Sequence, residues 1–328
     1  MKKLMSGNEA IALGIYEAGV RFAAAYPGTP STEIMEEFAK YEGVYAEWSP
    51  NEKVALEVAI GAALAGEKAV AVMKHVGVNV AADPLFTASY TGTNGALVIV
   101  TADDPSMHSS QNEQDNRNYA KFAKIPMLEP SDAQEAKEFI KLAFEISVKF
   151  DTPVFLRTTT RVSHSKSVVT TGTPLAYEDR TKIIYNSAKF VMVPANARTR
   201  RIEIEKRMQV LKEFAEVFSA NKMEINSPDV GIITAGMPYN YTKDVFPDYS
   251  YLKLGMVYPL PDKLIRDFAA RVKTIYVVEE LDPFLEEQIK AMGIKVIGKE
   301  IFPFTNEFDP GIIQTAITGG SAKASASG

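Results

Sequence analysis

The sequence of 328 residues contains no cysteine. This absence excludes disulfide bonds, cysteine nucleophiles, cysteine-ligated zinc and iron–sulfur clusters on this chain. Histidine is also scarce: His75, His108 and His164 are the only three, and their spacing is not that of a zinc site. We therefore predict no metal site here, and the lack of cysteine fits a cytoplasmic protein without proving it.

Long hydrophobic runs and an excess of one charge are missing as well. No apolar run approaches the ~20 residues that a membrane span needs, and two lysines at the start are not followed by the apolar stretch of a signal peptide. The formal net charge is only −5, which does not favour binding to nucleic acid or to a membrane surface. These features predict a soluble protein that binds neither.

The first half of the chain alternates short apolar runs with helical patterns, which is typical of an α/β fold. β-branched runs predict strands at residues 20–25, 69–73, 96–101 and 153–157, and helices are expected over 9–18, from Pro30, from Glu52 and over 131–149. Because the runs are continuously apolar, we expect central parallel strands with both faces covered.

The second half repeats this pattern after an interruption. We expect a linker at 168–227 with one docking helix over 198–218, and then strands at 230–234, 251–254, 274–278 and 295–297 with helices at 260–272 and 283–292. The prediction is therefore two doubly wound domains, at 1–167 and 228–318, and a flexible low-complexity tail at 319–328.

Polar residues follow three of the expected strands, where parallel sheets bind their ligands. These residues are 26–31, 74–79 and 102–108. Each group also has a plainer reading: a tight turn and helix cap after Tyr26, a hydrogen-bonded surface histidine at His75, and a solvated turn rather than a metal pair at Asp103 and Asp104. The pattern alone leaves these alternatives open.

Two interpretations of Glu52 compete, one structural and one functional. The residues Ser49-Pro50-Asn51-Glu52 form the pattern of a capping box, in which Glu52 would bond back to the amide of Ser49. Alternatively, a carboxylate buried at this helix start could hold a ring nitrogen of a cofactor. Taken alone, the capping box is favoured. No Gly-x-Gly-x-x-Gly or P-loop pattern occurs, so a common dinucleotide or ATP site is unsupported.

Taken together, the motifs favour the cofactor-binding interpretation of Glu52. Residues 26–33 followed by 47–53 resemble the pyrimidine-binding domain of thiamine-diphosphate enzymes, and more narrowly the 2-oxoacid:ferredoxin oxidoreductases. Residues 73–84, 102–115 and 157–164 are similar to the alpha subunits of the indolepyruvate type, and 253–261 with 278–284 continue the likeness. The resemblance covers about residues 1–318 and implies a pyrimidine-binding fold followed by a transketolase C-terminal-like domain.

The resemblance also implies roles for individual residues. Glu52 matches the family's glutamate, whose carboxylate binds N1′ of the aminopyrimidine and stabilises the tautomer that takes up the C2 proton; a desolvated setting would raise its pKa. Thr29 would face the substrate and the cofactor, His75 and Gly77 would line the cofactor site, and the substrate would contact residues of the same pocket. These substrate-binding residues are expected to be Tyr26, Thr29, His75, Asp104 and His108.

The chain departs from the family pattern in two ways. It has neither the Gly-Asp-Gly motif that holds Mg²⁺ and diphosphate nor the cysteines of the iron–sulfur modules. We therefore expect a partner subunit or domain that carries both, ferredoxin as the electron acceptor, an oligomeric assembly, and oxidative decarboxylation of an aryl 2-oxoacid such as indolepyruvate to its acyl-CoA. A non-catalytic assembly subunit, or part of a non-oxidative thiamine-dependent decarboxylase, remains as an alternative.

Overall fold

A computed structural model describes residues 1–177 and 183–319. Its largest sheet has seven strands in the order β12-β6-β7-β5-β4-β2-β3. Six of them pair in parallel and only β12 is antiparallel to its neighbour. The strands are β2 (Phe22–Ala25), β3 (Tyr45–Trp48), β4 (Lys68–Lys74), β5 (Ala96–Asp103), β6 (Met127–Leu128), β7 (Val154–Thr159) and β12 (Met256–Tyr258).

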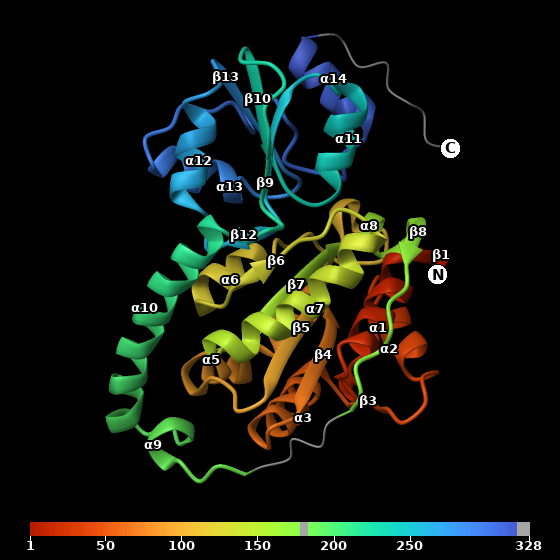
Figure 1. Cartoon of the computed structure of the whole chain (residues 1–328), viewed down its shortest axis with the longest axis vertical. Coiled ribbons are helices and arrows are strands. Elements are labelled where there is room, and N and C mark those ends of the chain that lie inside the picture. The colour runs from red at the N-terminus through yellow and green to blue at the C-terminus, as the bar shows by residue number, and fades with distance from the viewer. Residues whose placement is uncertain (178–182, 320–328) are drawn as a thin grey trace.

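Both faces of this sheet are covered, as the continuous apolar runs predict. In β4, Val70 and Val72 pack into one hydrophobic cluster, whereas Ala69, Ala71 and Met73 pack into another. The first cluster contains side chains of α1 (Gly7–Glu17), α2 (Thr32–Phe38) and α7 (Ala133–Phe150), and the second those of α3 (Glu52–Leu64), α5 (Ala82–Thr91) and α6 (Arg117–Ala123). The predicted doubly wound α/β architecture is confirmed (Figure 1).

Some of the expected helix starts were wrong. Pro30 does not open a helix: α2 begins at Thr32 after Ser31, and the Thr29–Pro30 peptide is cis. The helix expected from residue 131 is α7, and its cap is Asp132, whose carboxylate accepts from the amide of Glu135. At α1, in contrast, Ser6 and Glu9 form the reciprocal capping box that their spacing indicates.

The region between the two sheets contains more structure than a linker with one helix. β8 (Lys166–Thr170) pairs antiparallel with β1 (Lys2–Ser6), so this segment returns to the N-terminus. After α9 (Ser187–Phe190), the long α10 (Pro194–Glu216) runs along the molecule toward the second sheet (Figure 1). Arg200 and Arg207 on α10 donate to carbonyl groups at and beside the end of α5, which fixes α10 against the first sheet's helices.

The second sheet has four strands in the order β13-β10-β11-β9. The strands are β9 (Lys222–Glu224), β10 (Val230–Thr234), β11 (Ser250–Lys253) and β13 (Thr274–Val278), and the helices are α11 (Met237–Val245), α12 (Asp262–Ala269), α13 (Phe284–Ala291) and α14 (Pro310–Thr318). The strand expected at 295–297 is reduced to a single bridge between Ile297 and Tyr276. Of the expected flexible tail, residues 320–328 lie outside the described residues.

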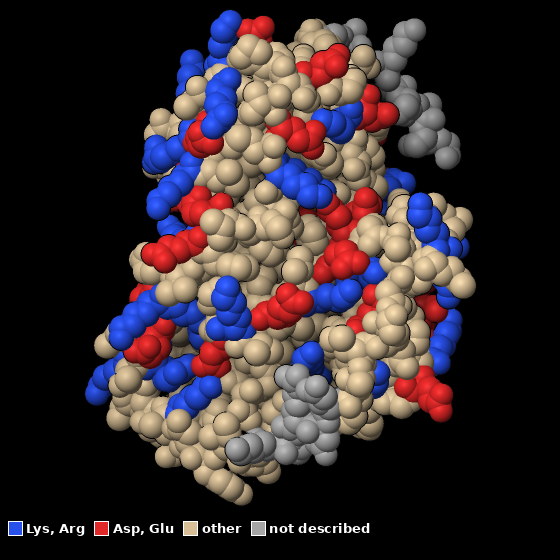
Figure 2. All heavy atoms as spheres, viewed as in Figure 1, with Lys and Arg blue, Asp and Glu red and all other residues tan. Residues whose placement is uncertain are grey.

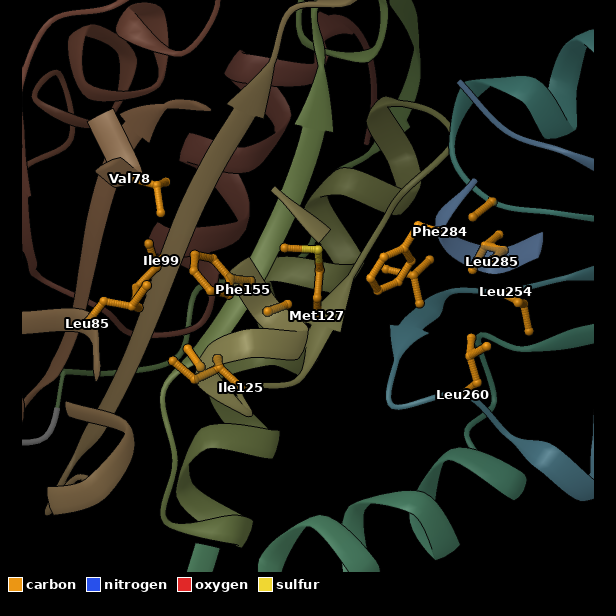
Figure 3. Close-up of a cluster of buried hydrophobic side chains, with 14 of the residues drawn as sticks. Val78, Leu85, Ile99, Ile125, Met127, Phe155, Leu254, Leu260, Phe284 and Leu285 are labelled. Carbon is orange, nitrogen blue, oxygen red and sulfur yellow. The ribbon is translucent and has the colours of Figure 1, made fainter. Parts of the chain in front are cut away.

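A continuous hydrophobic cluster joins the two sheets. It extends from Val78 and Ile99 through Met127 to Phe284 and Leu285 on the start of α13 (Figure 3). β12 follows β11 closely in the chain but pairs with β6, so the second half contributes a strand to the first sheet. This packing holds loops of the second half beside the carboxyl ends of the first sheet's strands.

Among the described residues, none of the helices combines the length and apolarity required to cross a bilayer. On the face seen in Figure 2, basic and acidic side chains are interspersed.

Candidate functional site

Glu52 lies at the carboxyl edge of the seven-stranded sheet as the first residue of α3. Asn51 caps this helix by accepting a hydrogen bond of 3.0 Å from the amide of Val54, and the amide of Ser49 donates instead to the carbonyl of Ala25. The capping-box reading of Glu52 is therefore wrong. The side chain of Glu52 is free for another purpose.

Glu52 is largely buried as a residue, and its carboxylate has no close partner in the described part of the chain. The residue is only 8% exposed, and within the described part of the chain no hydrogen bond or ion pair holds its carboxylate. Gly77 lies directly against it: a β-carbon at Gly77 would come within 2.6 Å of Glu52 Cγ and Oε1. A largely buried glutamate whose carboxylate makes no hydrogen bond within the chain can accept one from a bound group.

Lys74, the last residue of β4, connects three parts of the site. Its aliphatic chain covers Gly28, where a β-carbon would lie 2.9 Å from Lys74 Cδ. Its ammonium donates to the carbonyl of Ser109 at 2.9 Å. Burial lowers the pKa of Lys74, and the attraction of Asp104 and Glu52 opposes that shift only in part. Lys74 thus brings positive charge between two carboxylates of the site.

The turn that follows β2 is held by hydrogen bonds from Asn8 of α1. The side-chain amide of Asn8, which is buried, donates to the carbonyl of Pro30 at 2.7 Å and to Glu33 at 3.0 Å. The amide of Gly28 donates to the hydroxyl of Thr32. These bonds leave Tyr26 and Thr29 exposed at the sheet edge, as expected of residues that would contact a ligand or a partner.

Asp104 organises the loop after β5. It accepts from the amide of Ser109 at 2.8 Å and from the hydroxyls of Ser110 and Thr160 at 2.6 Å each. Burial alone would raise the pKa of Asp104, but these hydrogen bonds lower it and prevail. Asp104 is therefore a buried, ionised group that holds the loop, rather than a solvated turn residue.

His75 is fully buried, so it is not the surface histidine of the plainer reading. Its Nε2 lies 3.0 Å from the carbonyl oxygen of Asn112, and its Nδ1 has no hydrogen-bond partner among the described residues. The side-chain amide of Asn116 donates to the His75 carbonyl. His75 thus ties the start of α4 (His75–Val80), which carries Gly77, to the loop that follows β5.

A pocket of about 400 Å³ opens above this loop. It brings together Thr29, Asp104 and His108 of the predicted substrate site, whereas Tyr26, His75 and Gly77 do not line it. The other lining residues come from the loop after β5, from the helix α8 (Thr160–His164) and the residue that follows it, and from the second half of the chain. They are Ser109, Thr160, Arg161, His164, Ser165 and Glu307.

The sequence pattern gave no role to Lys74, Arg161 or Glu307. Lys74 and Arg161 stand within family-like motifs but have no diagnostic spacing, and Glu307 is brought to the pocket only by tertiary folding. Among the described residues, no three acidic, histidine or cysteine side chains are placed to hold a metal ion.

A buried network of charges lies beneath the site. Arg157 binds Asp103 at 2.7 Å and Glu129 at 2.6 Å, and Arg117 binds Asp115 at 2.5 Å and Glu279 at 2.7 Å. Since Glu279 follows β13, this network also joins the two halves of the chain. Every acidic member has an arginine partner, in contrast to Glu52.

Comparison with known proteins identifies the family to which the chain belongs. Residues 13–224 match the model of the family described as pyruvate flavodoxin/ferredoxin oxidoreductase, thiamine diphosphate-binding, and the chain belongs to that family. It is 45% identical over 331 aligned positions to indolepyruvate oxidoreductase subunit IorA of Archaeoglobus fulgidus, covering 96% of this chain and 53% of that protein. The chain thus spans about half the length of the curated relatives it matches.

Two solved structures share the fold. One is a 2-oxoglutarate:ferredoxin oxidoreductase from Magnetococcus marinus, with a TM-score of 0.81, 18% identity, and coverage of 97% of this chain and 65% of that one. The other is a split-gene transketolase described as an inactive β4 tetramer, with a TM-score of 0.59, 13% identity, and coverage of 95% and 97%. At these identities the likeness concerns the fold alone.

Proposed function

We propose that this chain supplies the aminopyrimidine side of a thiamine-diphosphate site in a 2-oxoacid:ferredoxin oxidoreductase. The observation that carries the proposal is Glu52, a largely buried residue that lies against Gly77 and whose carboxylate has no hydrogen-bond partner among the described residues. A ring nitrogen such as N1′ of an aminopyrimidine would satisfy it. The donor set therefore fits the cofactor that the family description names.

Several residues would act together in this site. Glu52 would hold a proton at N1′, Gly77 leaves the space in which the carboxylate lies, and Lys74 balances its charge. When bound, the cofactor would supply the carbon centre that attacks the 2-oxo group and stores the electrons of decarboxylation. Thr29, Asp104 and His108 would line the substrate side, and His75 would keep the α4 segment and the pocket loop in place.

The remaining parts of the reaction would come from elsewhere. A diphosphate-binding and iron–sulfur subunit or domain would hold Mg²⁺ and pass two electrons to ferredoxin, and the product would be an acyl-CoA. The length of the relatives, about twice that of the matched region, supports such a missing half. We propose an oligomeric assembly in the cytoplasm. We also propose an aryl 2-oxoacid such as indolepyruvate as the substrate, because the relatives are named indolepyruvate oxidoreductase subunits.

The variant Glu52→Gln tests this proposal. In the complex assembled with its iron–sulfur partner, arylpyruvate-dependent ferredoxin reduction should fall by at least ~100-fold, since an acid–base contribution is lost. Urea unfolding of the chain should be little changed, because Gln keeps the shape. Glu57→Gln, an exposed change five residues further along α3, is the matched control and should leave turnover intact. Near-normal turnover of Glu52→Gln would contradict the N1′ role.

A further inference from the structure

In the pocket, a carboxylate of the chain itself, that of Glu307, lies against Arg161 and His108. The Glu307 carboxylate pairs with Arg161 Nη2 and lies 3.4 Å from His108 Nε2. Both partners of Glu307 line the pocket beside Thr29, together with the hydroxyl-bearing Thr160 and Ser165. Hydrogen bonding to Glu307 raises the pKa of Arg161, so this guanidinium stays charged.

Glu307 can leave this position by rotation of its side chain alone. Its backbone is fixed on both sides: the Glu307 amide donates to the hydroxyl of Ser106 at 2.8 Å, and the Phe308 amide donates to Glu280 at 2.7 Å. The side chains of Arg161 and His108 are 47% and 46% exposed. The Glu307 side chain is 19% exposed, so each pair has one exposed and one partly exposed member. Such pairs near the surface typically contribute no more than about 1 kcal/mol, because water compensates the exposed partner when the two separate.

We infer that Arg161 and His108 form a carboxylate-binding subsite for a small organic acid, and that Glu307 is its built-in occupant. An incoming carboxylate would take over the contacts with Arg161 and His108 while Glu307 rotates away. This inference rests on the proposed function, because it assigns the pocket beside Thr29 to the acid group of the substrate. It makes Arg161 and Glu307 determinants of substrate affinity.

The surroundings favour a carboxylate over a phosphate. A planar guanidinium can bind both oxygens of a carboxylate, and in the chain Arg161 Nη2 already contacts one oxygen of Glu307. Asp104, whose pKa is lowered despite burial because of its three hydrogen bonds, adds a fixed negative charge to the same pocket. A doubly charged phosphate would be repelled more strongly by this charge than a singly charged acid. The volume of about 400 Å³ is within the range of small-ligand pockets.

Three histidines make the test simple. The 328-residue chain would be labelled with ¹³C at histidine Cε1 and titrated with phenylpyruvate, with His108 as the reporter and the buried His75 as the internal reference. The His108 signal should shift and saturate in the wild type, and Glu307→Gln should reach half-saturation at about fivefold lower concentration. This factor corresponds to the upper range of an exposed ion pair, about 1 kcal/mol.

Removal of the cation should have the opposite effect. Arg161→Gln should abolish the saturable shift of His108, whereas Arg271→Gln, which removes an exposed arginine paired with Asp267 outside the pocket, should behave as the wild type. Phenylacetamide and inorganic phosphate should fail to compete. Equal half-saturation in the wild type and Glu307→Gln, retained binding in Arg161→Gln, or equally tight binding of phosphate would overturn the inference.

The same titration separates this inference from the proposed function. It needs neither thiamine diphosphate nor the partner, so Glu52→Gln should leave it unchanged. If only the Glu52 test failed, the cofactor role of Glu52 would be contradicted, and Arg161 and His108 would still form a carboxylate-binding site with another function. A failure of the His108 titration alone would leave the cofactor site intact.

Discussion

Glu52 and Asp115 are both acidic side chains buried beside the seven-stranded sheet, but their surroundings differ. Asp115 accepts three hydrogen bonds from the Arg117 guanidinium, the shortest at 2.5 Å, and another from the Arg117 amide. Burial raises the pKa of Asp115, but Arg117 and Arg157 lower it and prevail. Glu52 has only the indirect influence of Lys74 and a glycine against its carboxylate.

Under the proposed function, this difference separates charges that hold the fold together from a charge that would bind a ligand. The paired buried ions hold the two halves of the chain together, and their hydrogen bonds are already made within the protein. An unpaired buried carboxylate is tolerated where a bound group completes its hydrogen bonds. The two kinds of site should therefore respond differently to substitution: stability should be lost at the paired one, and ligand chemistry at the unpaired one.

Arg117→Met should give the largest loss of stability. It leaves Asp115 and Glu279 buried without their common partner, which typically costs about 3–5 kcal/mol of unfolding free energy. Urea unfolding at neutral pH would measure it. Arg271→Met, which removes one member of an exposed pair with Asp267, should cost no more than about 1 kcal/mol. Equal effects of the two changes would contradict the structural role of the network.

Glu280 should give a pH-dependent effect of intermediate size. Burial raises its pKa to about 7 from an ordinary 4.5. Between these values the folded protein holds a proton that the unfolded chain has released, so the stabilisation is complete below pH 4.5 and is lost as the pH rises through 7. Glu280→Gln should therefore be more stable than the wild type by on the order of 2 kcal/mol at pH 8.

The advantage of Glu280→Gln should shrink toward pH 5, which urea unfolding at the two pH values would reveal. Glu57→Gln, at an exposed glutamate of α3, is the control and should show no such dependence on pH. A stability difference for Glu280→Gln that stays constant from pH 5 to 8 would contradict the raised pKa.

Gly77→Ala should have the smallest effect on stability and a clear effect on the site. The new β-carbon would push the flexible end of Glu52 away, so unfolding free energy should change by less than about 1 kcal/mol. Turnover of the assembled complex should fall by at least about tenfold, because the carboxylate leaves its position. Gly61→Ala, which meets no atom within 4 Å, should leave turnover unchanged.

The strands and the edge that carries the site could be predicted because they depend on local patterns. Continuous apolar runs predicted β4, β5 and β7. The polar residues that follow the strands predicted where the pocket lies. The role of Glu52 could not be decided from four residues, since Asn51 and Ser49 are both good caps and only the folded backbone selects one.

Other features depend on contacts that no local pattern encodes. Glu307 reaches Arg161 across 146 positions of sequence, and β12 is a three-residue strand that pairs with β6 of the first half. Arg117, an exposed residue by ordinary expectation, is buried because Glu279 arrives from another sheet. Such pairings follow from how the two sheets pack, which is why the charge network and the occupant of the pocket were missed.

The most direct measurement of the central claim is exchange of the C2 proton of thiamine diphosphate for deuterium in the assembled complex, without substrate. The wild type should exchange this proton at least ~100-fold faster than Glu52→Gln at equal cofactor occupancy, since only the wild type has a carboxylate at N1′. Glu57→Gln should match the wild type. Equal exchange in the wild type and Glu52→Gln would show that the buried carboxylate does not activate the cofactor.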